Sequence, residues 1–159
     1  MLQAKRTSLL AKEYELTRDD RALTTFSVKR GRIGAQFTLD GADYRIRSHR
    51  FSGVYELLGA DGSVLATTDR VSRRWSMHVS GRAWHFRRTA IASRDYSMIG
   101  EQGERTGSIR RTGHGSSGVA ADLPGLELNL QVFALAVVLL RWRRKRAAVA
   151  VRGAALAGG

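Results

Sequence analysis

The sequence predicts a mainly β protein, a closed antiparallel β-barrel of about ten to twelve short strands around one hydrophobic C-terminal helix. From Glu13 to about Asp122, β-prone runs alternate with turns containing Gly, Asp or Ser every 8 to 12 residues or so, which is typical of a sandwich or barrel. The segment Leu123–Arg146 is instead apolar nearly all the way round a helix. Such a helix must be buried in protein or lipid. One buried helix after many strands indicates a barrel wrapped around it.

The turn signals separate the expected strands. Asp40-Gly41 is typical of a tight turn, and Gly59–Gly62 is typical of a slightly longer hairpin loop. Pro124 is expected in the first turn of the helix, with Asp122 as its N-cap. The expected strands are Glu13–Thr17, Thr24–Lys29, Ala35–Leu39, Asp43–Ser48, Gly53–Leu58, Ser63–Thr68, Arg73–Val79, Arg82–Thr89, Asp95–Ile99, Arg105–Arg110 and Gly118–Ala121.

The chain has the length of a single domain, and its ends differ from its centre in composition. We expect residues 1–12 to form an N-terminal arm, because their apolar residues are scattered. Residues 13–146 are expected to form a single barrel-plus-helix domain. Residues 147–159, rich in Ala and Gly, are expected to form a flexible tail.

One hairpin can be given a register from its sequence. If Ser80-Gly81 is the turn, Met77 pairs with Trp84, Trp75 pairs with Phe86, and all four share the core face. The opposite face then carries the polar residues of the hairpin, including two arginines directly across from each other. These outward residues are Arg74, Ser76, His78, Ala83, His85 and Arg87.

The apolar helix is expected inside the barrel rather than in a membrane. Its uninterrupted apolar run, Val132–Leu140, would span roughly 14 Å, against about 30 Å of hydrocarbon. Extending the run towards the N-terminus admits Glu127, Asn129 and Gln131, and an ionised carboxylate is costly in lipid. The basic residues that follow the run suit the C-terminal end of a helix, although they also resemble the flank of a membrane-spanning segment.

Composition restricts the classes of function. The chain of 159 residues has no cysteine, which excludes thiol catalysis, thiolate metal sites and disulfides, and suits the reducing cytoplasm. Its N-terminus lacks the continuous apolar region of a secretory signal. Lys and Arg number 27 against 14 Asp and Glu, so the net charge is +13. This charge favours anionic partners, but an Arg-, Ala- and Gly-rich coding bias would produce the same balance.

The order of elements over Ala35–Arg146, the segment Tyr55–Ala66 and the closing helix Leu126–Trp142 together resemble the tubby C-terminal superfamily. That superfamily includes LURP-one-related and phospholipid scramblase-like proteins, in which a Tyr-x-Leu strand, an Asp-Gly turn and a second strand recur. The resemblance implies membrane-associated or scaffold-like behaviour, with phosphoinositide headgroups bound by basic side chains. The acidic calcium-binding segment of the scramblase-like proteins has no counterpart, because Thr112–Leu123 contains Asp122 as its sole carboxylate.

No motif in the sequence predicts a catalytic or cofactor site. None of the histidines stands in a metal-ligand spacing, and the glycine-rich segments Gly100–Gly107 and Gly113–Gly118 lack the surroundings of a phosphate-binding loop. The four histidines are His49, His78, His85 and His114. We therefore expect no enzyme, no metal and no cofactor.

The functional hypothesis is a non-enzymatic, cytoplasmic binding module that associates weakly with anionic membrane lipid, in particular phosphoinositide-type headgroups, on the inner membrane face. Trp142 is expected to be an interfacial aromatic residue among cations. Two alternatives stay open, a nucleic-acid-binding basic β-barrel and a protein-interaction scaffold, and the sequence does not indicate an oligomeric state. The expected contact residues are Arg141, Trp142, Arg143, Arg144, Lys145 and Arg146.

Overall fold

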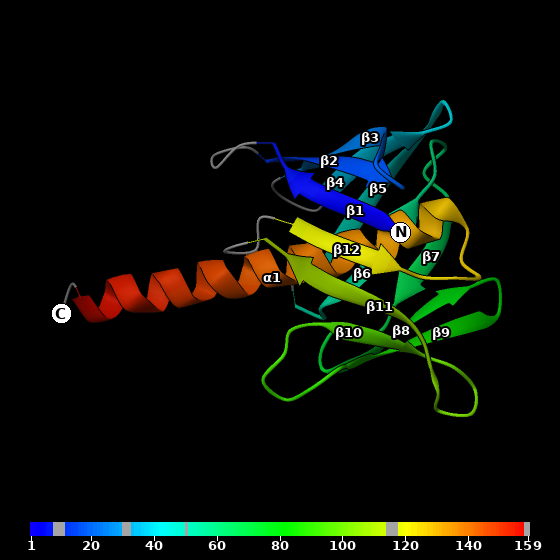
Figure 1. The fold of residues 1–159 in the computed structure, drawn as a ribbon. Helices are drawn as coiled ribbons and strands as arrows, with labels where there is room; N and C mark the ends of the chain where they lie inside the picture. Colours follow the sequence, from blue (N-terminus) through cyan, green and yellow to red (C-terminus); the bar gives the residue numbers. More distant parts are fainter. Residues whose placement is uncertain (8–11, 30–32, 50, 114–117, 158–159) are drawn as a thin grey trace.

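The computed structural model shows twelve antiparallel strands closed into a barrel around one helix (Figure 1). It describes residues 1–7, 12–29, 33–49, 51–113 and 118–157, without the side chains of residues 146, 147 and 154–157. The expected fold class is confirmed. The strands are β1 (Leu2–Arg6), β2 (Glu13–Arg18), β3 (Arg21–Val28), β4 (Ile33–Leu39), β5 (Ala42–His49), β6 (Val54–Leu58), β7 (Val64–Thr68), β8 (Arg74–Val79), β9 (Arg82–Arg88), β10 (Tyr96–Ile99), β11 (Arg105–Thr112) and β12 (Gly118–Asp122), and the helix is α1 (Leu128–Ala157).

Strand β1 corrects the expectation of an N-terminal arm over residues 1–12. It closes the barrel by pairing with both β12 and β2, so that Leu2 lies opposite Ala121 on one side and Arg18 on the other. Leu2 and Ala4 are buried. The physical reason is that a closed barrel in which every pair is antiparallel needs an even number of strands. In a meander, β2 and β12 run in the same direction, and one further strand between them lets every pair of the barrel be antiparallel.

The helix starts later and ends later than its sequence indicates. Asp122 is the last residue of β12, opposite Ser108, and is not the N-cap. A turn with Gly125 at φ 85° separates the strand from the helix, which then continues through the segment expected to be a flexible tail. That extension is helical because it is rich in Ala, the strongest helix former.

The core consists of α1 and the inward side chains of the strands. Every residue of Val132–Leu140 is buried, so the expected position of this run inside the barrel is confirmed. A helix that packs against strands on all sides needs no polar stripe, and this explains the uniformly apolar sequence of the run. Leu140 also lies near Gly34 of β4, where a Cβ atom would be 3.4 Å from its Cδ1.

The register expected for the β8–β9 hairpin is confirmed. Met77 lies opposite Trp84 and Trp75 opposite Phe86, with the Trp75 and Phe86 rings stacked 4.2 Å apart. Ser80 and Gly81 both have positive φ, 47° and 78°, as this tight turn requires.

Candidate anion-binding surface

The connections at the two ends of the barrel differ in charge. Because each strand reverses direction, successive connections alternate between the two ends. The end at which α1 begins has the connections 19–20, 40–41, 59–63, 80–81, 100–104 and 123–127, and we call it the acidic mouth. These connections contain seven carboxylates and no Lys or Arg, all within the described chain. The carboxylates are Asp19, Asp20, Asp40, Asp61, Glu101, Glu104 and Glu127.

The opposite end, from which α1 leaves the barrel, is the basic mouth. It is formed by the connections β1–β2, β3–β4, β5–β6, β7–β8, β9–β10 and β11–β12. Their described residues include two carboxylates, Asp69 and Asp95, which bond to His78 and to the Arg111 backbone amide respectively. The described Lys and Arg residues of these connections are Lys12, Lys29, Arg70, Arg73 and Arg94.

Two arginines of α1 are held by strands at the basic mouth. Arg143 Nη1 donates to the hydroxyl of Tyr14 on β2 at 3.1 Å. Arg144 Nη2 donates to Ser48 Oγ on β5, also at 3.1 Å. Both acceptors are neutral, so these contacts position the guanidinium groups without neutralising their charge.

The structure corrects the expected role of Trp142. Its side chain is 3% exposed and belongs to the hydrophobic core. The guanidinium of Arg111, at the end of β11, lies 5.3 Å from the centre of the ring, a favourable cation–π distance. The Trp142 ring packs inwards because the buried face of α1 continues this far along the helix. It therefore anchors the helix inside the barrel and is not an interfacial residue.

Lys145 shows how closely the cations are gathered. Burial lowers the pKa of its ammonium group, and the positive charges of Arg141, Arg88, Arg94 and Arg73 lower it further. These four arginines come from the helix, from the end of β9 and from two connections. Arg141 and Lys145 are half-buried, and Arg144 is exposed. The side chain of Arg146 lies outside the described residues.

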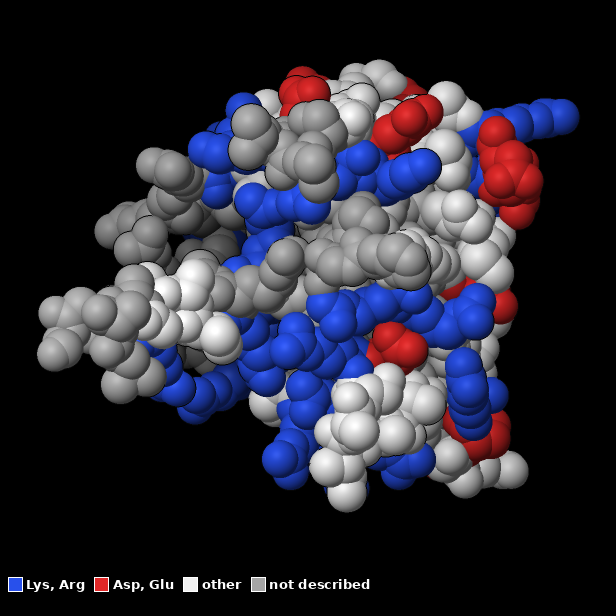
Figure 2. Space-filling view, turned by 60° about the vertical axis from the view of Figure 1, so that its left-hand side comes forward, with Lys and Arg blue, Asp and Glu red and all other residues white. Residues whose placement is uncertain are grey.

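We call this cluster the cationic collar. Figure 2 shows a broad band of Lys and Arg side chains at the base of the projecting helix. Within the described part of the chain, no ion pair joins the helix cations of the collar, or Arg73, Arg88 and Arg94, to a carboxylate. The collar consists of Arg73, Arg88, Arg94, Arg111, Arg141, Arg143, Arg144 and Lys145.

Sequence reasoning found the helix cations and missed Arg73, Arg88, Arg94 and Arg111. They are distant in sequence from the helix and are brought to it by barrel closure. A signal was nevertheless present in the sequence. In an up-and-down barrel, every second connection along the chain lies at the same mouth. Grouping the odd-numbered and the even-numbered connections and comparing their charges would have separated the acidic from the basic mouth.

Exposed apolar side chains also gather at the basic mouth. Phe51, in the β5–β6 connection, and Ile91, in the β9–β10 connection, are almost completely exposed. Beyond the collar, Val149 and Val151 of α1 are 67% and 69% exposed. Isolated exposed apolar residues are ordinary, but these four lie at the same end of the molecule as the cations.

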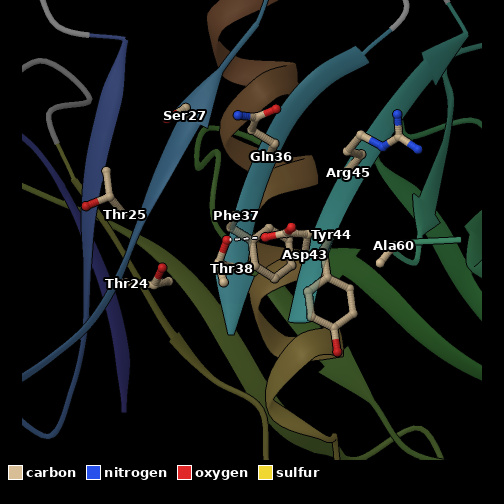
Figure 3. Close-up of a pocket in the computed structure, with 10 residues that line it drawn as sticks. All are labelled: Thr24, Thr25, Ser27, Gln36, Phe37, Thr38, Asp43, Tyr44, Arg45 and Ala60. Carbon is tan, nitrogen blue, oxygen red and sulfur yellow. Dashed lines mark hydrogen bonds between the residues drawn. The ribbon is translucent and has the colours of Figure 1, made fainter. Parts of the chain in front are cut away.

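A hollow lies on the barrel wall, away from the collar. Its volume is about 740 Å³, and it forms where β3 and β4 diverge after pairing at Ser27–Gln36 and Val28–Ala35. Figure 3 shows hydroxyl and amide side chains along this hollow, with Thr38 hydrogen-bonded to Asp43. Its two charged groups, Asp43 and Arg45, have opposite signs. The hollow therefore lacks the concentrated charge of the collar.

The histidines of β8 and β9 each bond to one polar side chain. Ser76 Oγ and His85 Nδ1 are 2.7 Å apart, and Asp69 bonds to His78. Among the described side chains, no hydrogen bond completes a Ser-His-Asp arrangement, and no group of three His, Asp or Glu residues could hold a metal ion.

Comparisons of this chain with protein-family models, with curated proteins and with solved structures found no match. Among the described residues, no helix has both the length and the apolar character needed to cross a bilayer.

Proposed function

We propose that this protein is a non-enzymatic binding module that docks on an anionic membrane surface through the cationic collar. The observation that carries this proposal is the gathering of Arg73, Arg88 and Arg94 around the described cations of the helix, none of which forms an ion pair with a carboxylate of a described residue. Repulsion among like charges is unfavourable unless an anion lies between them. A layer of phosphate-bearing headgroups supplies such anions.

The separation of charge along the barrel would orient the protein. The field of an anionic leaflet attracts the basic mouth and repels the seven carboxylates of the acidic mouth. At about 1 kcal/mol for each basic residue near the surface, the eight collar cations contribute at most about 8 kcal/mol. Binding of this kind is reversible and weakens with salt.

The experiment is vesicle flotation with phosphatidylcholine vesicles, alone or with phosphatidylserine or a phosphoinositide. The test variant is Arg73→Gln/Arg94→Gln/Lys145→Gln. Its matched control is Arg18→Gln/Arg21→Gln/Arg105→Gln, which removes the same charge from exposed residues near the acidic mouth. We expect the test variant to lose about 3 kcal/mol, a roughly hundredfold weaker partition, and the control to bind like the wild type.

Equal loss in the two variants would show that net charge, rather than the collar, determines binding.

The principal alternative is nucleic acid, which also presents phosphates. Trp75 and Phe86 are buried and offer no surface on which bases could stack, which leaves Phe51 as an exposed ring at the basic mouth. A titration with duplex DNA and RNA at the same salt concentrations separates the two. Collar-dependent binding to a duplex but not to vesicles would establish the alternative. Binding to neither a duplex nor vesicles would leave a protein-interaction scaffold.

A barrel around a central helix is also what the resemblance to tubby-like proteins implies, and phosphoinositide headgroups are accordingly included among the lipids. The proposed location is the cytoplasmic face of a membrane. This follows from the absence of cysteine and from the anionic lipid that such a surface presents.

A further inference from the structure

Helix α1 continues well beyond the collar and projects from the barrel (Figure 1). From Ala148 to Ala157 its sequence is Ala, Val, Leu and Gly with a single charged residue, Arg152. Val149 and Val151 have no strand to pack against and are mostly exposed. Exposed apolar surface costs roughly 25 cal/mol for each Å² that could be removed from water. This part of the helix is therefore unlike a solvated surface helix, which alternates polar and apolar faces.

The order of chemical groups along the molecular axis is distinctive. The collar comes first, and the apolar end of the helix follows it. Phe51 and Ile91 are exposed at the tips of two connections of the same mouth. A bilayer presents groups in the matching order, because its anionic headgroups overlie the hydrocarbon.

We propose that residues 148–157 of α1, together with Phe51 and Ile91, insert into the hydrocarbon region of the membrane on which the collar docks. This inference rests on the proposed function and adds a penetrating element to it. At 1.5 Å per residue the ten helical residues reach about 15 Å, roughly half the thickness of the hydrocarbon core. The long side chain of Arg152 extends its guanidinium back towards the headgroups.

A second copy of the chain fits this end of the helix less well. Packing two such helices in parallel would bring two cationic collars together, and like charges in contact are unfavourable. Packing them antiparallel would place the apolar end of each helix against the arginines of the other. Nucleic acid would satisfy the cations but offers no apolar phase for Val149 and Val151. The lipid bilayer is the partner that satisfies both groups.

The absence of cysteine makes a site-specific probe straightforward. Val151→Cys carries an environment-sensitive fluorophore, and Gln102→Cys, exposed in a connection of the acidic mouth, carries it as the control. On phosphatidylserine vesicles we expect the label at position 151 to shift to the blue and to be quenched by lipids with a nitroxide on the acyl chain. The label at position 102 should show neither change.

A matched pair of variants tests the energetic contribution. Val149→Gln/Val151→Gln removes the apolar groups without altering charge, and Val64→Gln/Leu65→Gln makes the same change at exposed apolar residues near the acidic mouth. At about 0.15 M salt, where charges are screened beyond about 8 Å, the first variant should partition about tenfold more weakly, or about 1.4 kcal/mol. The second should bind like the wild type.

The outcomes separate the two proposals. Collar-dependent vesicle binding with an unquenched label at position 151 would overturn insertion and leave the proposed function standing. No binding to anionic vesicles would overturn both. A blue shift without vesicles that grows with protein concentration would show that a second copy covers the helix, which also overturns insertion.

Discussion

Arg143 of α1 donates a hydrogen bond to the hydroxyl of Tyr14, 129 residues away in the sequence, at 3.1 Å. The ring of Tyr14 is buried, 6.1 Å from that of Phe26. The contact joins the point where the helix leaves the barrel to the beginning of β2. It therefore positions a cation of the collar by means of the core.

Removing this hydroxyl should have a small, measurable effect. Tyr14→Phe retains the buried ring and loses the hydrogen bond to Arg143, so we expect a loss of about 0.5–1.5 kcal/mol in the free energy of unfolding. Urea denaturation provides the measurement. Tyr44→Phe is the control, because the structure shows no hydrogen bond from that hydroxyl to a described residue, and its stability should be nearly unchanged. Equal losses in the two variants would show that the Arg143 contact does not contribute.

The central helix should be sensitive to cavities. Phe133 is completely buried within the barrel, and Phe133→Ala should reduce the free energy of unfolding by about 3–5 kcal/mol. Val149→Ala, on the exposed part of the same helix, should change it by less than about 0.5 kcal/mol. A loss below about 1 kcal/mol for Phe133→Ala would place that side chain outside the core.

An ion pair on the outer wall should make stability depend on pH. Glu56 accepts hydrogen bonds at 3.1 and 3.0 Å from Arg47 and also contacts His49. The hydrogen bond from Arg47, followed by that from His49, lowers the pKa of Glu56 below its usual 4.5. The Glu56 carboxylate therefore binds a proton more readily in the unfolded chain than in the folded protein. The stabilisation is complete above pH 4.5 and is lost as the pH falls through the lowered folded-state value.

The measurement is the difference in the free energy of unfolding between the wild type and Glu56→Gln as the pH is reduced. The wild type should be more stable at neutral pH, and the difference should shrink below pH 4.5. A difference independent of pH would show that the Glu56 charge does not contribute.

Lys145 should make the opposite contribution. Burial and the neighbouring arginines lower the pKa of its ammonium group from 10.5. Lys145 therefore binds its proton less tightly in the folded protein than in the unfolded chain. Protonated Lys145 therefore destabilises the fold at neutral pH. This effect disappears as the pH rises through the lowered value towards 10.5. We expect Lys145→Met to raise the melting temperature at neutral pH while weakening vesicle binding.

Lys29→Met is the control for that variant, because Lys29 is an exposed lysine of the β3–β4 connection. Its melting temperature should be close to that of the wild type. A lower melting temperature for Lys145→Met would contradict the idea that the collar is held together against repulsion.

The register of the β8–β9 hairpin was predictable to the residue, because its alternation of Trp75, Met77, Trp84 and Phe86 with polar residues specifies both face and register. Strand β1 was not. Its five residues include two apolar side chains, Leu2 and Ala4, and so short an alternation does not stand out from a disordered arm. Its strand structure depends on pairing with β12, more than 110 residues later in the sequence. A pattern of neighbouring residues does not indicate such a distant partner.

The sequence by itself determined the alternation of the strands and the burial of Val132–Leu140, since both follow from side-chain periodicity and the cost of exposing apolar surface. It also placed a group of cations after that run. Tertiary structure decided which neighbours these cations have: barrel closure brings Arg73, Arg88 and Arg94 to the helix and turns Trp142 inwards. Charges act through space and burial depends on the final packing, so neither can be read from separation along the chain.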